Sequence, residues 1–214
     1  MQRYCLFNLL LVTALIATFS ACNNATEKKS ASNEAKKDSP AIVAKSKEEP
    51  PAKRPGIINF TDTVSIKHTV LCIKDSAKTY DRIALKLGEI YGLKLGVFMK
   101  KNNIKMAGAP MAWYSTNKPP YFFEAGVAID KKITKLPPKA YIKEIGTDSV
   151  LVAHYYGPYD LLSEAYEAAN DYLKDHHRTL KSSPYEIYIG DPFDKNGHPI
   201  DPYKVQTDVV FPWK

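Results

Sequence analysis

A glutamate flanked by tyrosines offers the clearest chemistry in the sequence. It lies in the run Tyr185-Glu186-Ile187-Tyr188-Ile189-Gly190, which predicts a short β-strand. Successive side chains of a strand point to opposite faces, so Glu186 and Tyr188 share a face. If the isoleucines meet a helix layer, Glu186 lies on the other side of the sheet. A carboxylate among aromatic rings suits planar, often cationic ligands, although the alternation equally fits a solvated glutamate.

A second aromatic run should lie one strand away from Glu186. It contains His154, Tyr155 and Tyr156, and we expect His154 with one of the two tyrosines beside the glutamate. The other histidines have simpler roles. His176 and His177 close a helix, where positive charge is favourable, His198 lies in a turn and His68 in a strand. No spacing typical of metal ligands is present, so we expect no metal site and no cofactor.

The elements that must position these residues fall into two similar series. The first predicts strands at 64–73, 106–114 and 121–129, with a helix from 79 to 101 after the first strand. Apolar residues recur in this helix at spacings of three and four and define one buried face: Ile83, Leu87, Ile90, Tyr91, Leu95 and Phe98. The glycines Gly88, Gly92 and Gly96 form a smooth strip, for which we expect close packing on the sheet.

The second series repeats this order. It predicts strands at 150–156, 185–190 and 204–211, with a helix from 159 to 176 after the first strand. The sequence therefore predicts an α+β domain of two pseudo-symmetric β-α-β-β units. They should form one antiparallel sheet with two helices on one face and a ligand cleft on the other.

Several short motifs, in this order along the chain, resemble the GyrI-like small-molecule-binding family. They cover nearly all of residues 62 to 212, and together they are specific although each alone is weak: Gly108-Ala109-Pro110 through Tyr114, Gly157-Pro158-Tyr159, Glu164-Ala165-Tyr166, Pro184-Tyr185-Glu186-Ile187-Tyr188, Asp191-Pro192 and Phe211-Pro212. The family includes the effector-binding domains of multidrug-sensing transcription activators. Its members have two pseudo-symmetric β-α-β-β units around a hydrophobic cleft.

The resemblance also implies which residues bind a ligand. The buried family glutamate that contacts cationic ligands corresponds to Glu186. The aromatic residues of the cleft correspond to Tyr114 and Tyr188, and less directly to Tyr156 or Trp113. No helix-turn-helix precedes the domain in this sequence, so the role in transcription is not carried over.

The N-terminal residues predict export. Leu6 to Phe19 is almost unbroken apolar sequence, which is typical of a secretory signal and short for a membrane-spanning helix. Phe19-Ser20-Ala21-Cys22 resembles a bacterial lipobox, with Phe19 where leucine is usual, and an ordinary cleavage site is the alternative. We therefore expect a signal peptide at 1–21 and a lipid on Cys22, which would anchor the protein to the membrane on the periplasmic side of the cell envelope.

Residues 22 to 58 have the composition of a disordered linker, rich in Lys, Glu, Ala, Ser and Pro. The globular domain is then expected at 59–214. Of the net charge of +7, this domain carries only +3, from 21 Lys and Arg against 18 Asp and Glu. Such a small excess argues against a nucleic-acid partner. Cys72 lies in an apolar run and is expected to be a buried, inert thiol; no protein partner can be inferred.

Three functions compete at this stage. The first is noncatalytic binding or sensing of small amphipathic molecules, including cationic ones, at the cell envelope. The second is a hydrolase of reactive, cyclopropanoid-type molecules that uses the same glutamate as acid or base, as the family resemblance allows. The third is haem binding, because the related SOUL domains share the double β-α-β-β plan. No nucleophile paired with a base is visible, so binding without catalysis is the favoured interpretation.

Overall fold

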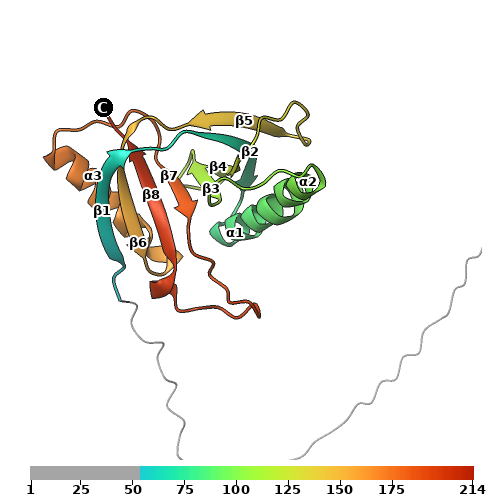
Figure 1. The fold of residues 1–214 in the computed structure, drawn as a ribbon. Coiled ribbons are helices and arrows are strands. Elements are labelled where there is room, and N and C mark those ends of the chain that lie inside the picture. Colours follow the sequence, from blue (N-terminus) through green and yellow to red (C-terminus); the bar gives the residue numbers. More distant parts are fainter. Residues whose placement is uncertain (1–53) are drawn as a thin grey trace, which may run out of the picture. The chain divides into compact units, whose positions relative to one another are not determined.

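A computed structural model describes residues 54 to 214 of the chain (Figure 1). The expected signal peptide, Cys22 and most of the expected linker lie outside these residues. The described part contains eight strands in one antiparallel sheet. They are β1 (Ile57–Val64), β2 (His68–Ala77), β3 (Met111–Tyr114), β4 (Tyr121–Ile129), β5 (Ala140–Ile145), β6 (Ser149–Tyr156), β7 (Tyr185–Tyr188) and β8 (Gln206–Pro212).

Two helical segments accompany the sheet. The first is continuous and consists of α1 (Tyr80–Gly88), a π-helical stretch η1 (Glu89–Gly96) and α2 (Val97–Lys101). The second is α3 (Ser163–Asp175), preceded by a 3-10 turn η2 (Tyr159–Leu161), and a further 3-10 turn η3 (Pro202–Lys204) leads into β8. None of these helices combines the length and the apolar character needed to span a membrane.

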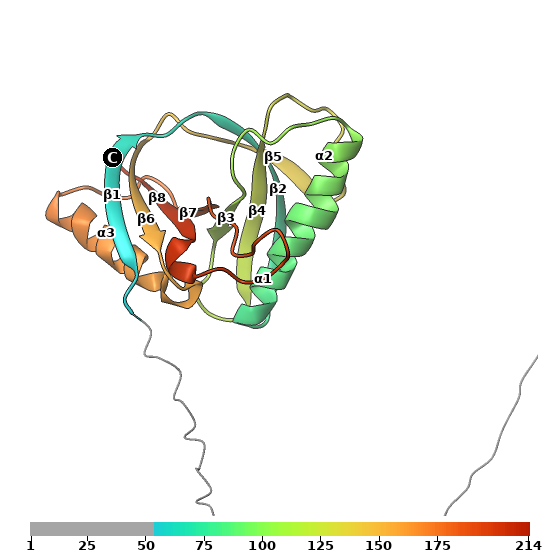
Figure 2. The same ribbon diagram turned by 60° about the horizontal axis from the view of Figure 1, so that its bottom comes forward.

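The sheet has two halves with the same order of elements, as predicted. The strand order is β1-β6-β8-β7-β3-β4-β2-β5, so β7 and β3 join the halves in the middle. Figure 2 shows α3 on the flank of β6 and β1, and the α1–α2 helix along β2 and β4. The expected α+β fold with two pseudo-symmetric β-α-β-β units is therefore confirmed.

Two strands outside the repeat connect the halves crosswise. Strand β1 precedes β2 but pairs with β6, while β5 precedes β6 but pairs with β2. The loops after β1 and β5 meet where the strands cross: the Ser65 amide donates to the Asp148 carbonyl at 2.9 Å and the Thr147 amide to the Ser65 carbonyl at 2.8 Å. Because β1 starts at Ile57, Ile57 and Ile58 belong to the sheet, although the sequence placed them in the linker.

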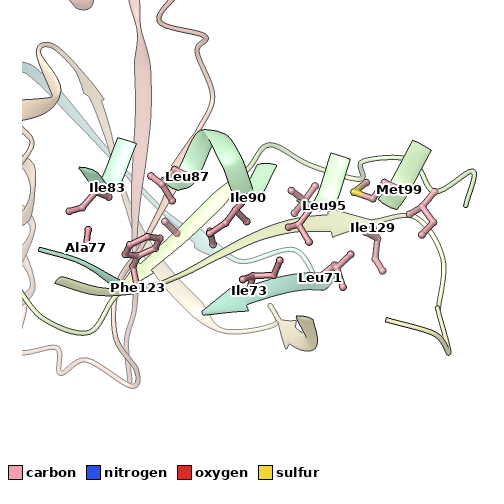
Figure 3. Close-up of a cluster of buried hydrophobic side chains, with 14 residues drawn as sticks. Leu71, Ile73, Ala77, Ile83, Leu87, Ile90, Leu95, Met99, Phe123 and Ile129 are labelled. Carbon is pink, nitrogen blue, oxygen red and sulfur yellow. The ribbon is translucent and has the colours of Figure 1, made fainter. Parts of the chain in front are cut away.

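Three apolar clusters fill the domain. One lies between the α1–α2 helix and the first half of the sheet (Figure 3), with Ile83, Leu87 and Ile90 from the helix and Phe123 from β4 among its members. A second lies between α3 and the other half. The third contains Val70, Cys72, Met111, Trp113, Ala128, Val150, Tyr185 and Val210, and it forms on the face of the sheet that carries no helix. Both faces of the sheet are therefore partly buried.

The glycine strip of the first helix differs from its expected role. A Cβ atom at Gly88 or Gly92 would meet nothing within 4 Å, so neither glycine allows a close approach of the sheet. At Gly96 a Cβ would lie 2.7 Å from the carbonyl oxygen of Tyr91, five residues earlier in the same helix. The wider π-helical turn also explains how Ile90 and Leu95, five residues apart, are both fully buried.

Candidate functional site

Glu186 lies in β7, at the junction of the two halves. In the sheet it stands opposite Ala112 of β3 on one side and Val209 of β8 on the other. Both neighbours are buried and belong to the two clusters beneath the helices. Cross-strand neighbours point to the same face, so the Glu186 side chain faces the helix layer. Only 3% of the residue is exposed.

Three tyrosine hydroxyls donate hydrogen bonds to the carboxylate. Tyr159 and Tyr188 donate to Oε2 at 2.5 and 2.9 Å, and Tyr166 donates to Oε1 at 3.0 Å. No Lys, Arg or His forms an ion pair with Glu186 within residues 54–214. The negative charge is therefore supported by neutral donors alone, which leaves it available to a cation from outside.

Burial raises the pKa of Glu186 above its ordinary value of 4.5, and the three hydroxyl donors offset part of this shift. The same environment raises the pKa values of Tyr159, Tyr166 and Tyr188 well above 10, through burial and through the nearby carboxylate. The phenols thus remain protonated around neutral pH. They therefore act as donors to the carboxyl group.

A fourth tyrosine extends this hydroxyl cluster. The Tyr114 hydroxyl lies 2.9 Å from that of Tyr188 and 3.1 Å from that of Tyr159. Since Tyr159 and Tyr188 give their single protons to Glu186, Tyr114 must be the donor in whichever of these bonds it makes. Tyr114 belongs to the first half of the domain and the other three tyrosines to the second. The cluster thus links both halves.

Above this cluster lies a cavity of about 1110 Å³. Its walls come from α1, from the turn between β3 and β4, and from η2 and α3, so it lies between the two helices. The walls include five tyrosines: Tyr80, Tyr114, Tyr121, Tyr159 and Tyr166. Three acidic residues, Asp160, Glu167 and Glu186, line it against a single cation, Lys118. The cavity is therefore large enough for a drug-sized molecule and has an excess of negative charge.

The cavity is on the face that carries the helices, whereas the sequence analysis placed the cleft on the opposite face. The alternation of β7 was correct, since Glu186 and Tyr188 do share a face. The assumption that the isoleucines meet the helices was wrong, because Ile187 packs in the cluster of the helix-free face. That face is closed by its own apolar side chains.

The structure divides the predicted site residues into two groups. Glu186 and Tyr114 line the cavity, and Tyr188 supports Glu186 from the strand. Trp113 and Tyr156 lie on the helix-free face instead. Trp113 stacks on Tyr185 at 5.2 Å, and the Tyr156 hydroxyl donates to Gln206 at 2.7 Å. Strand alternation explains both results, because each of these residues directly follows or precedes one that faces the helices.

Sequence reasoning did not assign Tyr80, Tyr159 or Tyr166 to the site. Tyr159 and Tyr166 were named as members of the family motifs, in a helix predicted from 159 to 176. The two are seven residues apart, which is about two helical turns, so a shared face could have been noticed. No sequence pattern places Tyr80 in the site, because its position there depends on how the two halves pack. The centre of its ring lies 6.1 Å from that of Tyr159.

The other residues considered for chemistry are engaged elsewhere. His154 lies on the helix-free face, where its ring nitrogens lie 2.7 Å from Asp208 Oδ1 and 3.0 Å from Thr61 Oγ1. No histidine lines the cavity, and the described residues contain no group of three His, Cys, Asp or Glu placed to hold a metal. Cys72 is fully buried, and burial raises the pKa of its thiol to about 12.

No family model and no curated protein sequence matches the chain. Solved structures do match. The EcmrR C-terminal domain is similar with a TM-score of 0.57 and 17% identity, over 74% of this chain and 98% of that one. In the EcmrR–DNA complex the TM-score is 0.60 and the identity 18%, over 74% of this chain and only 57% of the EcmrR chain.

Two further structures have the same arrangement. SAV2435, solved with tetraphenylphosphonium bound, has a TM-score of 0.50 and 14% identity, over 73% of this chain and 94% of that one. A hydrolase from Listeria innocua has a TM-score of 0.51 and 10% identity, over 76% and 93% of the two chains. At these identities the similarity establishes the fold: the chain shares the α+β architecture of the EcmrR C-terminal domain and of SAV2435.

Proposed function

We propose that this protein binds small amphipathic molecules, cationic ones in particular, in the cavity between its two helices, and that it does not turn them over. The observation that carries this proposal is the buried Glu186, held by three neutral hydroxyl donors and by no cation from residues 54 to 214. A buried charge without a counter-ion is costly, and a ligand cation would relieve that cost. SAV2435, which has the same fold, was solved with such a cation bound.

The walls of the cavity support the same ligand class. Tyrosine rings present apolar faces that attract positive charge and flat aromatic groups. Tyr80, Tyr121 and Tyr159 stand together in the cavity wall. The ring centre of Tyr80 lies 6.3 Å from that of Tyr121 and 6.1 Å from that of Tyr159. An aromatic cation would thus be held by contacts with these rings and by the Glu186 carboxylate.

Binding without turnover follows from how Glu186 is held. Both of its oxygens already accept hydrogen bonds, and the tyrosines around it stay protonated because their pKa values are raised. A nucleophile paired with a general base is not present among the residues that line the cavity. The site is therefore suited to charge pairing rather than to covalent catalysis.

Hydrolysis is the second candidate, and one specific observation favours it. Burial raises the pKa of the Glu186 carboxyl group and so favours its protonated form, which can donate a proton to a reacting bond. The Listeria innocua protein of the same fold is described as a hydrolase. A strained ring that opens on protonation would be the fitting substrate class.

One experiment separates the two functions. The purified protein is titrated with tetraphenylphosphonium by calorimetry, and the small molecules that co-purify with it are identified by mass spectrometry. Binding requires saturable heat that weakens in Glu186→Gln and no chemical change of any co-purified compound over time. Time-dependent conversion that stops in Glu186→Gln would instead establish the hydrolase.

The site of action is part of the proposal. We infer that the protein is exported and held at the cell envelope by a lipid on Cys22, and that it senses or captures its ligands there. The support is the apolar N-terminus followed by Phe19-Ser20-Ala21-Cys22. Mass spectrometry of the N-terminal peptide should find a diacylated Cys22, and Cys22→Ser should move the protein from the membrane to the soluble fraction. An unmodified cysteine would refute the anchor and leave ligand binding untouched.

A further inference from the structure

The residues that enter the domain from the expected tether are docked onto it by specific contacts. We call residues 54 to 56 the docking segment. The Tyr203 hydroxyl donates to the carbonyl of Arg54 at 2.5 Å, and the Arg54 guanidinium lies 4.3 Å from the centre of the Tyr203 ring. The amide of Gly56 donates to Glu164 Oε2 at 3.1 Å. Glu164 lies in the first turn of α3, the helix that forms one wall of the cavity.

The docking segment also lies directly against the chain that leads into the cavity. A Cβ at Gly56 would overlap the ring of Tyr155. At Gly157 a Cβ would lie 2.6 Å from the Tyr155 hydroxyl and 3.1 Å from the Cα of Gly56. The two glycine backbones therefore pack around one buried tyrosine, and neither can shift far without disturbing the other.

Two residues after Gly157 comes Tyr159, which donates the shortest hydrogen bond to Glu186. The turn between them is fixed at Pro158, whose carbonyl accepts from the Tyr155 hydroxyl and from the Leu161 amide, both at 2.9 Å. Tyr155 is thus a shared support: one side of its ring contacts the docking segment, and its hydroxyl holds the turn that carries Tyr159. A second connection runs through α3, where Glu164 binds Gly56 and Tyr166 binds Glu186.

We propose that the occupancy of the cavity controls how firmly the docking segment is held. This regulation rests on the proposed binding function. A cation that pairs with Glu186 competes with the Tyr159 hydroxyl for the same carboxylate oxygen. Displacement of Tyr159 loosens the turn at Pro158, then the support from Tyr155, and so the packing of Gly56. By linkage, release of the docking segment must change ligand affinity by the same factor. The domain can thereby report its ligand state to the chain that precedes it.

Hydrogen exchange of residues 54 to 60 in the full chain tests this coupling without a ligand. Tyr159→Phe and Tyr188→Phe each remove one donor to Glu186 Oε2, but only Tyr159 is on the segment that contacts the docking residues. We expect exchange in residues 54 to 60 to rise about fivefold in Tyr159→Phe, the equivalent of one hydrogen bond, and less than twofold in Tyr188→Phe. Equal changes in both variants, or none in either, would overturn the coupling.

A second arm adds tetraphenylphosphonium to the wild-type chain and to Glu186→Gln. Faster exchange in residues 54 to 60 of the wild type alone is the expected result. Binding that leaves their exchange unchanged would overturn the coupling while the proposed function stands. Failure to bind, together with a selective effect of Tyr159→Phe, would overturn the cation-binding function while the coupling stands.

Discussion

Replacing Glu186 by glutamine tests the charge at the base of the cavity. Glutamine has nearly the same shape and keeps one oxygen that can accept from the tyrosines, so the change removes the charge and one of the two acceptor atoms. A carboxylate and a ligand cation about 5 Å apart attract each other by about 3 kcal/mol at an effective dielectric constant of about 20. Because desolvation of the ligand offsets part of this attraction, we expect a loss of affinity of about 10- to 100-fold.

The assay compares two ligands of similar size that differ in charge. Tetraphenylphosphonium carries the positive charge, and triphenylphosphine oxide presents phenyl rings on a neutral phosphorus. Both are titrated by calorimetry into the wild type and into Glu186→Gln, with circular dichroism to check that the variant is folded. The neutral ligand should lose less than about threefold in affinity, because ring contacts with Tyr80 and Tyr159 do not depend on the carboxylate.

Two results would refute this reasoning. Equal losses for both ligands would mean that glutamine disturbs the cavity rather than its charge. No loss for either ligand would mean that the ligands bind away from Glu186. The wild type offers an independent check, because protonation of Glu186 has the same effect as the substitution. Its affinity for tetraphenylphosphonium should fall towards that of Glu186→Gln as the pH is lowered through the raised pKa of the carboxyl group.

Three further predictions follow from the same contacts. The pKa of Glu186 is higher in the folded than in the unfolded chain. The wild type should therefore lose stability relative to Glu186→Gln as the pH rises from about 4.5 through the folded pKa. Urea unfolding at several pH values measures this difference. Gly96→Ala should destabilise the protein by about 1 to 3 kcal/mol, because the new Cβ meets the Tyr91 carbonyl oxygen. Gly92→Ala should stabilise it by about 0.5 to 1 kcal/mol, because a Cβ there meets nothing and alanine favours the helix. Thermal unfolding of both variants measures the two effects. Trp113→Phe should cost about 1 to 2 kcal/mol through its lost contacts on the helix-free face and leave tetraphenylphosphonium affinity within twofold, which calorimetry would measure.

The central elements of the fold could be predicted from the sequence because their apolar residues are regularly spaced. Strand β4 has the predicted bounds, and the first helix covers nearly the predicted range. Strands β1 and β5 were both missed, since the first predicted strand, 64–73, corresponds to β2 and shares only Val64 with β1. Both are edge strands whose residues are largely exposed or half-buried, so they lack the alternation of apolar and polar residues that marks a strand with one buried face.

The face of the sheet that carries the site could not be predicted, and the reason lies in how both faces are buried. Alternation fixes which side chains share a face, as it did for Glu186 and Tyr188, but it does not say which face meets the helices. Here the helix-free face forms an apolar cluster with Tyr185 and Trp113, so large side chains occur on both sides. A rule that assigns the more apolar face to the helices fails in such a sheet.

The position of the carboxylate between the two halves explains why residues of both halves make the site. Strands β3 and β7 are short, and only Met111 with Ile187 and Ala112 with Glu186 are paired across them. Ala112 is small, so the space above it is left to tyrosine side chains that reach in from both halves. The charge therefore lies where the two units meet, and movement of one unit against the other must change the set of donors around Glu186. The proposed ligand binding is for this reason expected to depend on how the two halves are arranged.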